Sequence, residues 1–402
     1  MIEPADLERT PNALAPHYSR SNVGGRLLLT GHSHQAWPDV ALEGQVDAFD
    51  DAARAVDEKW ELAFAKADVV RGWFARWLGT DAGEIALGAS THDLIIRFLS
   101  ALDLRARPRL VTTDGEFHTL RRQSRRLAEA GLDVVTLPAE PAETLAERLA
   151  DETADPRTAA VLVSSVLFET ARIVPELPLL AAVCETRGVE LLVDVYHALG
   201  PIPTSIAGLR LERAWAVGGG YKYLQLGEGN CFMRLPPHAS ELRPVVTGWY
   251  AEFDALTTAP GDDRVAYGPG PARFAGSTYD PTSHYRAARV IGFFEAHGLT
   301  PELLAASYRH QLSVLADRFD ALEAPESLIS RDKSTPVSSY AGFLALRTPR
   351  AAGLQRALHE RGVLTDSRAG HLRLGPAPYL SDAQLADAVE RLGEAIAGFS
   401  SD

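Results

Sequence analysis

The chain has 402 residues, enough for two domains with a buried core, and its 46% apolar and 23% charged residues are typical of a globular enzyme. Its formal net charge of −13 argues against a nucleic acid or an anionic membrane surface as a partner. The two cysteines, Cys184 and Cys231, form no CxxC pair and have no histidines at metal-ligand spacing, so we expect no disulfide framework, no bound metal and a reducing, cytoplasmic location.

The N-terminal region predicts one short strand followed by a polar loop. The first residues are acidic and lack an apolar segment, so we expect neither a signal peptide nor a membrane span. Residues 25–30 predict the strand, and residues 31–38 contain His32, Ser33 and His34. Two histidines with one residue between them and no nearby carboxylate do not suit a metal. A substrate-contacting loop and an ordinary turn both explain this segment.

Residues 40–78 predict helical structure. Bulky apolar side chains recur at three- and four-residue separations, with Trp60, Phe64, Trp73 and Trp77 among them. This spacing is typical of a helix with one buried face. We expect all four aromatic side chains in the core.

Residues 84–96 predict a strand, a tight turn and the start of a helix. Ser90 and Thr91 lie at the turn, where a helix N-terminus presents N–H and O–H donors and favours an anion. A bound phosphate and a plain N-cap explain these two hydroxyl residues equally well.

An alternation of buried strands and helices follows, which indicates βαβ units and a mostly parallel sheet. We expect residues 85–235 to form one doubly wound domain. Phe117 follows the strand at residues 109–114, where its flat ring could stack on a planar cofactor. The other predicted elements are strands at 134–137, 159–167 and 191–194 and helices ending at 132, 149 and 186.

Asp194 ends one of these predicted strands, and His197 follows three residues later. In an open α/β sheet the functional residues gather at the carboxyl ends of the strands. A carboxylate in that place could keep a pyridinium nitrogen protonated, as pyridoxal phosphate chemistry requires. Taken alone, Asp194 is equally consistent with a helix cap.

Lys222 lies in the segment Gly218-Gly219-Gly220-Tyr221-Lys222-Tyr223-Leu224, and the chain has three other lysines. An amine buried among apolar groups has a lowered pKa and becomes a nucleophile toward aldehydes. We expect the three glycines to let the backbone approach a cofactor closely. The alternative interpretation is a lysine in a surface hairpin. The predicted strand that ends in Asp194 makes this alternative less favoured.

The C-terminal part predicts a smaller α+β module after a Gly- and Pro-rich region. Residues 247–250 and 268–278 are rich in aromatic and polar side chains, which favours a functional loop. Arg373 lies between apolar residues on a short strand, where it suits a substrate carboxylate or a structural ion pair. The predicted elements are helices at 282–297, 301–323, 351–361 and 381–397 and strands at 340–346 and 372–374, with a capping box from Ser381 to Gln384.

Taken together, these motifs resemble kynureninase, a class V member of the fold-type I pyridoxal phosphate enzymes. The Asp194-x-x-His197 and Tyr221-Lys222-Tyr223-Leu224 motifs carry the resemblance, which extends from Gly31 to the last helix. The resemblance implies an α/β fold-type I transferase fold with a large doubly wound domain at residues 56–290. It also implies an N-terminal segment at 1–55 that packs with a small α+β domain at 291–402.

The resemblance assigns pyridoxal 5′-phosphate as cofactor and implies a role for each matching residue. Lys222 would form the covalent link and move the proton, Asp194 would pair with the pyridinium, and His197 would lie beside the cofactor. Phe117 would stack on the ring. Ser90, Thr91, Tyr221 and Trp249 would hold the phosphate, with Ser277 and Thr278 arriving from the neighbouring subunit of a homodimer. Arg373 would bind the α-carboxylate of an amino-acid substrate, with His32, His34 and Tyr250 as further substrate contacts.

Several departures from the family pattern concern the substrate. The family segment Gly-Asn-Ser-Leu-Gly is Gly31-His32-Ser33-His34-Gln35 here, and Gly-Trp-Phe-Gly-His is Gly248-Trp249-Tyr250-Ala251-Glu252. The acid expected three residues after Phe117 is replaced by Leu120. We therefore expect the cofactor chemistry to be kept and the side-chain specificity to differ.

The leading hypothesis is a kynureninase-like hydrolase or lyase that cleaves the Cβ–Cγ bond of its substrate and releases alanine. A β-lyase, a decarboxylase or an aminotransferase acting on another amino acid is the alternative. A cysteine desulfurase is disfavoured because no cysteine lies beyond Cys231. A scaffold that keeps the fold without the cofactor is a third hypothesis.

Overall fold

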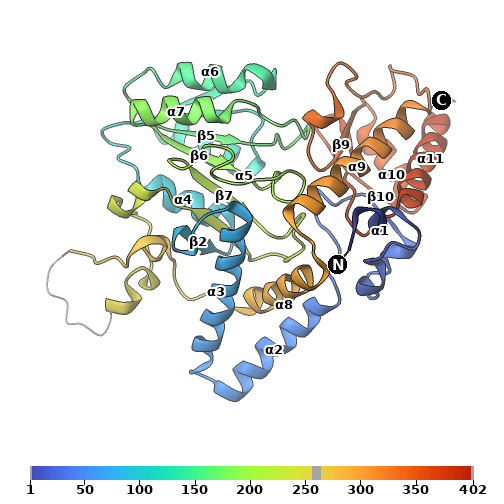
Figure 1. Ribbon diagram of the computed structural model, residues 1–402. Helices are drawn as coiled ribbons and strands as arrows, with labels where there is room; N and C mark the ends of the chain where they lie inside the picture. Colours follow the sequence, from blue (N-terminus) through green and yellow to red (C-terminus); the bar gives the residue numbers. More distant parts are fainter. Residues whose placement is uncertain (1, 256–263, 400–402) are drawn as a thin grey trace.

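The computed structural model describes residues 2–255 and 264–399, which form a large lobe and a smaller lobe (Figure 1). The large lobe contains a seven-stranded sheet in the order β2-β8-β7-β6-β5-β3-β4. The strands β7, β6, β5, β3 and β4 run parallel, while β8 is antiparallel to both β2 and β7. The strands are β2 (Ile85–Gly88), β3 (Arg109–Thr113), β4 (Asp133–Leu137), β5 (Thr158–Ser164), β6 (Glu190–Asp194), β7 (Trp215–Gly219) and β8 (Cys231–Arg234).

Helices cover both faces of this sheet, so the strands are buried on both sides. In β6, Leu191 and Val193 face one core and Leu192 faces the other, which is the two-residue period of a strand. The two-sided burial explains why these strands are nearly continuous apolar runs in the sequence. The helices of the large lobe are α2 (Val40–Ala55), α3 (Lys59–Leu78), α4 (Thr91–Ala101), α5 (His118–Glu129), α6 (Leu145–Glu152), α7 (Leu177–Arg187) and α8 (Thr282–His297).

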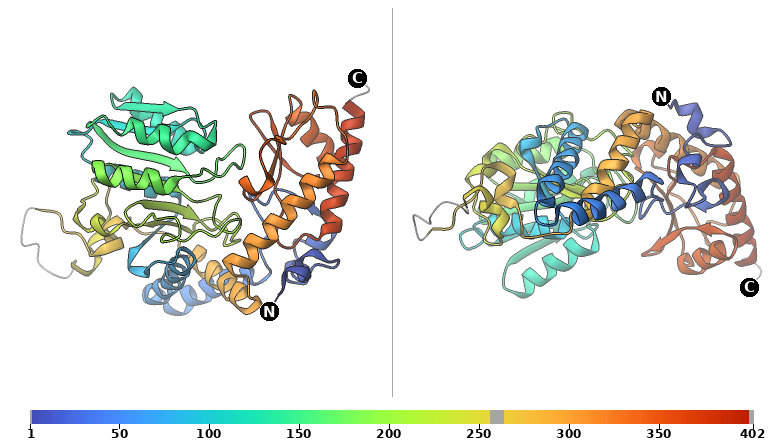
Figure 2. Two further views of the ribbon diagram at one scale, coloured as in Figure 1. Left: turned by 45° about the horizontal axis from the view of Figure 1, so that its top comes forward. Right: turned by 90° about the horizontal axis from the view of Figure 1, so that it is seen from below.

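The small lobe packs three helices against a three-stranded antiparallel sheet, and Figure 2 shows it beside the large lobe in two further views. The N-terminal segment contributes to this lobe, because β1 (Leu27–Leu28) pairs in parallel with β10 (Val363–Leu364). The domain boundaries given above remain predictions. The other elements are α1 (Pro4–Glu8), α9 (Pro301–Asp320), α10 (Ala351–Glu360), α11 (Asp382–Phe399), β9 (Leu344–Arg347), β11 (Asp366–Arg368) and β12 (His371–Leu374).

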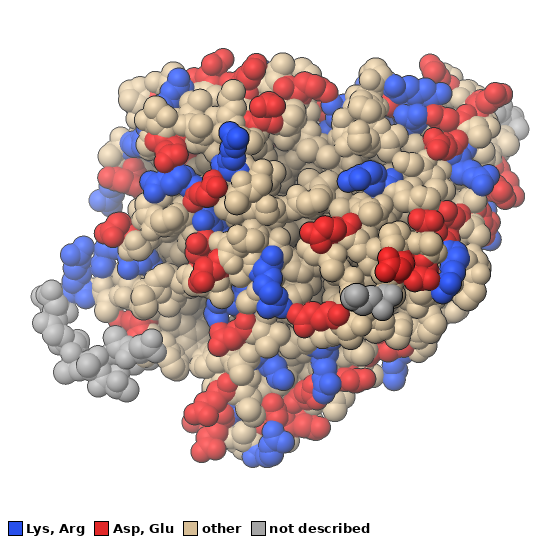
Figure 3. Space-filling model, viewed as in Figure 1, with Lys and Arg blue, Asp and Glu red and all other residues tan. Residues whose placement is uncertain are grey.

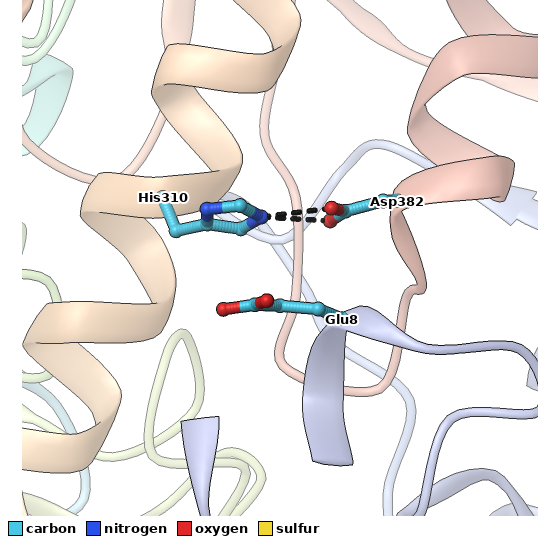
Figure 4. A group of neighbouring side chains, drawn as sticks. All are labelled: Glu8, His310 and Asp382. Carbon is cyan, nitrogen blue, oxygen red and sulfur yellow. Dashed lines mark hydrogen bonds and ion pairs between the residues drawn. The ribbon is translucent and has the colours of Figure 1, made fainter. Parts of the chain in front are cut away.

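A polar contact joins two sequence-distant helices of this lobe. His310 Nε2 on α9 lies 2.9 Å from each carboxylate oxygen of Asp382 at the start of α11. The side chain of Glu8, at the end of α1, lies beside this pair (Figure 4). The His310–Asp382 contact therefore joins the two long helices α9 and α11.

Several details of the sequence-based predictions are confirmed at the ends of helices. The helix predicted to end before Gly298 does so, and Gly298 takes a left-handed conformation with φ 71° that glycine tolerates without strain. The capping box of α11 is also present, because Ser381 N donates to Gln384 Oε1 at 3.0 Å and Gln384 N donates to Ser381 Oγ at 3.4 Å.

Other predictions need correction. Trp60 and Phe64 are half-buried and pack on each other near the surface, although Trp73 and Trp77 are in the core as predicted. The helical stretch from 40 to 78 is two helices, and the chain turns between them at Val56, whose φ is 51°. The strands predicted at 25–30 and 340–346 are shorter, as β1 and β9.

The surface shows no single-sign region on the face drawn in Figure 3, where acidic and basic side chains are interspersed and a groove lies between the lobes. Within residues 2–255 and 264–399, every helix is too short or too polar to cross a membrane.

Candidate active site

Lys222 is a buried amine that follows β7 and is 6% exposed. Its Nζ lies 2.7 Å from Nε2 of His197 and 4.6 Å from the ring centre of Tyr196. Burial lowers the pKa of Lys222 to about 8, with the Arg373 guanidinium acting in the same direction and the Asp194 carboxylate opposing both. Lys222 therefore releases its proton far more easily than an exposed lysine.

His197 is held as a neutral imidazole. Burial lowers its pKa well below the ordinary value, and the nearby Lys222 charge lowers it further. Its Nε2 can accept a hydrogen bond from the Lys222 amine, whereas its buried Nδ1 has no hydrogen-bond partner among the residues that the structure describes. His197 is thus a neutral acceptor beside the amine.

Asp194 ends β6, and its Oδ1 accepts a hydrogen bond from the Tyr196 backbone N–H at 2.8 Å. Burial raises the pKa of Asp194, and the Tyr196 hydrogen bond and the Lys222 charge partly oppose this effect. Asp194 and Lys222 line the same cavity, because β6 and β7 are adjacent parallel strands whose carboxyl ends meet at one edge of the sheet.

The N-terminus of α4 forms another part of the cavity wall. Ser90 caps this helix, because its Oγ accepts a hydrogen bond from Asp93 N at 3.1 Å. Ser90 and Thr91 also line the cavity, so the capping role predicted for Ser90 does not exclude the phosphate role predicted for both. The partial positive charge of an 11-residue helix at this end favours an anion.

The cavity has a volume of about 260 Å³, slightly below the ~300 Å³ at the lower end of ligand sites in proteins. Aromatic rings form much of its wall. The rings of Phe117 and Phe168 meet edge to face with centres 5.0 Å apart, and Lys222 Nζ lies 5.5 Å from the centre of the Phe117 ring. The lining residues are Ala89, Ser90, Thr91, His92, Phe117, Thr119, Ser164, Val166, Phe168, Asp194, Tyr196, His197, Tyr221, Lys222, Glu228, Gly229 and Cys231.

The prediction that three glycines let the backbone approach a cofactor is wrong. A Cβ on Gly219 would lie 2.5 Å from the Tyr196 hydroxyl and 2.7 Å from Cys231 Sγ, and a Cβ on Gly220 would lie 2.5 Å from a methyl of Leu226. Gly218 is likewise in contact with other side chains, and none of the three lines the cavity. These glycines make room for neighbouring side chains that pack behind Lys222.

Arg373 lies behind the cavity wall in a buried ion pair. It is 2% exposed, its Nη2 donates to Asp366 Oδ2, and its Nη1 donates to the Phe168 carbonyl oxygen at 2.8 Å. His32 Nε2 lies 3.4 Å from the same Asp366 oxygen, and its ring stacks on Phe343. Burial lowers the pKa of His32 to about 4, and the Arg373 charge contributes to the decrease. The structure therefore shows the ion pair expected for Arg373, while its carboxylate-binding role remains a prediction.

The remaining predicted residues are placed further from Lys222. His34 is exposed and stacks on Tyr221 at the edge of the cavity, with ring centres 5.1 Å apart. Tyr250 and Trp249 do not line the cavity of their own chain. Trp249 Nε1 instead donates to Thr278 Oγ1 at 3.3 Å on the surface, next to Ser277. Ser277 and Thr278 do not line this cavity either, and the cofactor contacts predicted for Trp249, Ser277 and Thr278 and the substrate contact predicted for Tyr250 remain predictions.

Sequence reasoning missed ten of the seventeen lining residues, among them Ser164, Phe168, Tyr196 and Glu228. Ser164 ends β5 next to Asp194 and is found by the same strand-end argument. Phe168 and Glu228 lie in irregular segments that carry no comparable signal in the sequence.

Comparisons with known proteins place this geometry in one structural class. A mutant of C-DES with glycine covalently linked to its pyridoxal phosphate cofactor superposes with a TM-score of 0.81 at 17% identity, covering 94% of this chain and 98% of that one. An apo cysteine desulfurase from Thermococcus onnurineus NA1 gives 0.77 at 16% identity, covering 99% of both chains. The chain therefore has the fold of the fold-type I pyridoxal-phosphate-dependent enzymes.

A sequence comparison agrees with this fold. The chain is 23% identical over 345 residues to the uncharacterized aminotransferase YcbU of Bacillus subtilis (strain 168), covering 83% of this chain and 85% of that protein. No protein-family model matches the chain. The kynureninase subtype implied by the motifs remains a prediction.

Proposed function

We propose that the protein is a pyridoxal 5′-phosphate-dependent enzyme that acts on an L-amino acid and cleaves a bond of its side chain. One observation carries the proposal: a buried, easily deprotonated lysine and a buried carboxylate line one cavity with a helix N-terminus and aromatic rings. These are the groups that a phosphorylated, flat, nitrogen-containing aldehyde needs.

The residues of the cavity fit the cofactor group by group. Lys222 would hold the aldehyde carbon covalently, Asp194 would face the ring nitrogen, and the N-terminus of α4 with Ser90 and Thr91 would hold the phosphate. Phe117 would pack on the ring face. When bound, pyridoxal phosphate supplies an electron sink that stabilises negative charge at the substrate Cα.

The chain's own contribution is to hold and move protons in a dry site. Lys222 would take the proton from the substrate Cα, and the neutral His197 at 2.7 Å can orient the lysine by accepting a hydrogen bond from it. Burial raises the pKa of Asp194, and the Tyr196 N–H and the Lys222 charge work against that rise; a cationic ring beside Asp194 would favour its ionised form further. Phe117 and Phe168 exclude water from Lys222.

Two side-chain reactions fit the site. The motifs favour kynureninase-type hydrolysis, in which water adds to the γ-carbonyl, the Cβ–Cγ bond breaks and alanine leaves. The fold neighbour C-DES, a cystine C–S lyase that matches with a TM-score of 0.78 at 17% identity, favours β-elimination instead. Desulfuration by an enzyme thiol is not favoured, because burial raises the pKa of both Cys184 and Cys231 to about 12.

Two measurements test the proposal. Purified protein with added pyridoxal phosphate should absorb near the visible edge, and borohydride should convert that band into a reduced adduct on the peptide that contains Lys222. A protein without this adduct would be a cofactor-free scaffold. L-kynurenine should then yield anthranilate and L-alanine if hydrolysis is correct, whereas L-cystine should yield pyruvate, ammonia and cysteine persulfide if β-elimination is correct.

We also propose that the enzyme is a homodimer. An aromatic surface cluster supports this proposal: Trp249 is 40% exposed, Phe253 is 43% exposed, and both contact Tyr250, which packs on Trp60. Exposed apolar clusters of this kind mark interaction surfaces. Trp249→Glu should give a monomer in sedimentation equilibrium while the matched surface change Leu179→Glu leaves the dimer intact.

A further inference from the structure

Glu116 is a buried carboxyl group next to the candidate active site. It lies between β3 and α5, directly before Phe117, and is 1% exposed. A carboxyl group is almost never this buried without a specific set of partners. Its neighbour Phe117 lines the cavity, although Glu116 itself does not.

Three donors hold the Glu116 carboxyl group. Thr113 Oγ1 donates to Oε1 at 2.7 Å, Ser164 N donates to Oε1 at 3.2 Å, and Ser164 Oγ donates to Oε2 at 2.5 Å. These donors come from the ends of β3 and β5, so both oxygens are fixed toward the carboxyl edge of the sheet. Hydrogen bonds of this number and kind stabilise the ionised carboxylate.

Ser164 connects Glu116 to Asp194. The two residues Ser164 and Asp194 are partners in the adjacent strands β5 and β6, and both line the cavity. Adjacent strands lie about 4.8 Å apart, so Ser164, which donates to Glu116, is the direct strand neighbour of Asp194. Burial raises the pKa of Glu116 to about 7 against the hydrogen bonds from Ser164 and Thr113, and the charge of Asp194 adds a smaller contribution in the same direction as burial.

Position 120, on α5, carries no acidic side chain. The position three residues after Phe117 carries an acid in kynureninases and is Leu120 here, a side chain that is 3% exposed in the second core. The titratable or polar groups that face Glu116 from β3, β5 and β6 are therefore Thr113, Ser164 and Asp194.

We propose that Glu116 is a positioning residue that acts through Ser164 and Asp194 to keep the cofactor's ring nitrogen positively charged. The inference rests on the proposed function, since it concerns the same cofactor. An ionised Glu116 adds a second negative charge behind Asp194, which favours a cationic ring facing Asp194. Binding of the cationic ring in turn favours the ionised form of Glu116.

The test compares two ligands on the Glu116→Gln variant. Glutamine keeps the shape of the side chain and removes its charge. The dissociation constant of pyridoxal 5′-phosphate, measured by fluorescence titration of cofactor-free protein, should rise about tenfold, the equivalent of one pKa unit of interaction. The dissociation constant of the analogue with a CH group in place of the ring nitrogen should stay unchanged, because that ring carries no charge to stabilise.

The effect should also depend on pH with a defined sign. Above a pKa of about 7 Glu116 is ionised in the wild type, and below it a protonated glutamate resembles glutamine. The dissociation constant of pyridoxal phosphate for Glu116→Gln, divided by that for the wild type, should therefore increase from about pH 6 to about pH 8. The control Glu129→Gln, an exposed residue on the same α5 helix, should leave both ligands unaffected.

Each other outcome overturns the inference. Equal weakening of both ligands would show that Glu116 only holds the loop, and no weakening of either would show that its charge is not felt. If Glu116→Gln fails to fold, Ser164→Ala is the second variant, and it must weaken pyridoxal phosphate more than the analogue. A wild type that binds neither ligand would instead refute the proposed function.

Discussion

Two groups of charged residues lie in or next to the candidate active site. They differ in whether their opposite charges form ion pairs. In the sheet-edge group, Lys222 and Asp194 form no ion pair among the residues that the structure describes, and they line an open cavity. In the small-lobe group, Arg373 and Asp366 are bound to each other behind the wall, with His32 beside them. Unpaired buried charges are costly, so they indicate where a charged ligand is expected, whereas paired ones hold the fold.

The largest expected effect tests the sheet-edge group. Lys222→Ala removes the amine that would hold the cofactor and move the proton, so turnover of the accepted substrate should fall by about 10³-fold or more. The fold should survive, because the change removes a buried charge. Steady-state kinetics and far-UV circular dichroism check the two parts. Lys59→Ala, on the surface of α3, is the matched control and should keep the wild-type rate; a Lys222→Ala variant that also kept it would contradict the assignment.

The second effect tests the small-lobe group. Arg373→Met removes the buried partner of Asp366 and leaves this carboxylate with the more exposed Arg368, whose Nη1 lies 3.1 Å from Oδ1. The free energy of unfolding should therefore fall, by less than the roughly 3–5 kcal/mol of a buried charge left with no partner. The double variant Arg373→Met/Asp366→Asn should recover part of that loss, since no uncompensated charge remains. Chemical denaturation measures both.

A binding role for Arg373 would add a different signature. If Arg373 also binds the substrate carboxylate, the double variant should regain stability but keep a raised KM. A normal KM in the stable double variant would leave Arg373 with a purely structural role.

The same contrast explains which parts were predictable from the sequence. Asp194 and Lys222 could be predicted because parallel strands bring their carboxyl ends to one edge whatever the detailed packing. The Asp366–Arg373 pair depends on the register of β11 against β12, which pairs these two residues directly and which the local pattern of a three-residue strand does not determine. Glu116 was missed because a single acid before an aromatic residue has no periodic signal.

Packing among distant side chains accounts for the errors. Gly219 and Gly220 are explained by the side chains of Tyr196, Cys231 and Leu226, which come from other segments, and Gly218 by Phe232 and Leu199. Trp60 and Phe64 have the spacing of a buried helical face, yet they lie against Tyr250 on the surface. Periodicity identifies an apolar face and does not tell whether the same chain or a second subunit covers it.

The smallest expected effect tests whether burying Lys222, in the sheet-edge group, lowers the stability of the folded protein. Burial lowers the pKa of Lys222 to about 8 in the folded protein, whereas an unfolded lysine titrates near its ordinary value of 10.5. Between these two values the unfolded chain holds a proton on this lysine that the folded chain does not, so the loss of stability caused by burying Lys222 should shrink as the pH rises across this window. Below pH 8 both states are protonated and the penalty is constant.

Lys222→Met keeps the apolar stem and removes the titrating group. In thermal unfolding of cofactor-free protein the variant should be more stable than the wild type by a few degrees at neutral pH, and its advantage should shrink as the pH rises from about 8 toward 10.5. Because methionine does not titrate, the variant should lack the contribution of Lys222 to the pH dependence of stability. A variant less stable than the wild type at neutral pH would mean that the His197 contact compensates the burial of Lys222, and the two charged groups would then not differ in the way proposed.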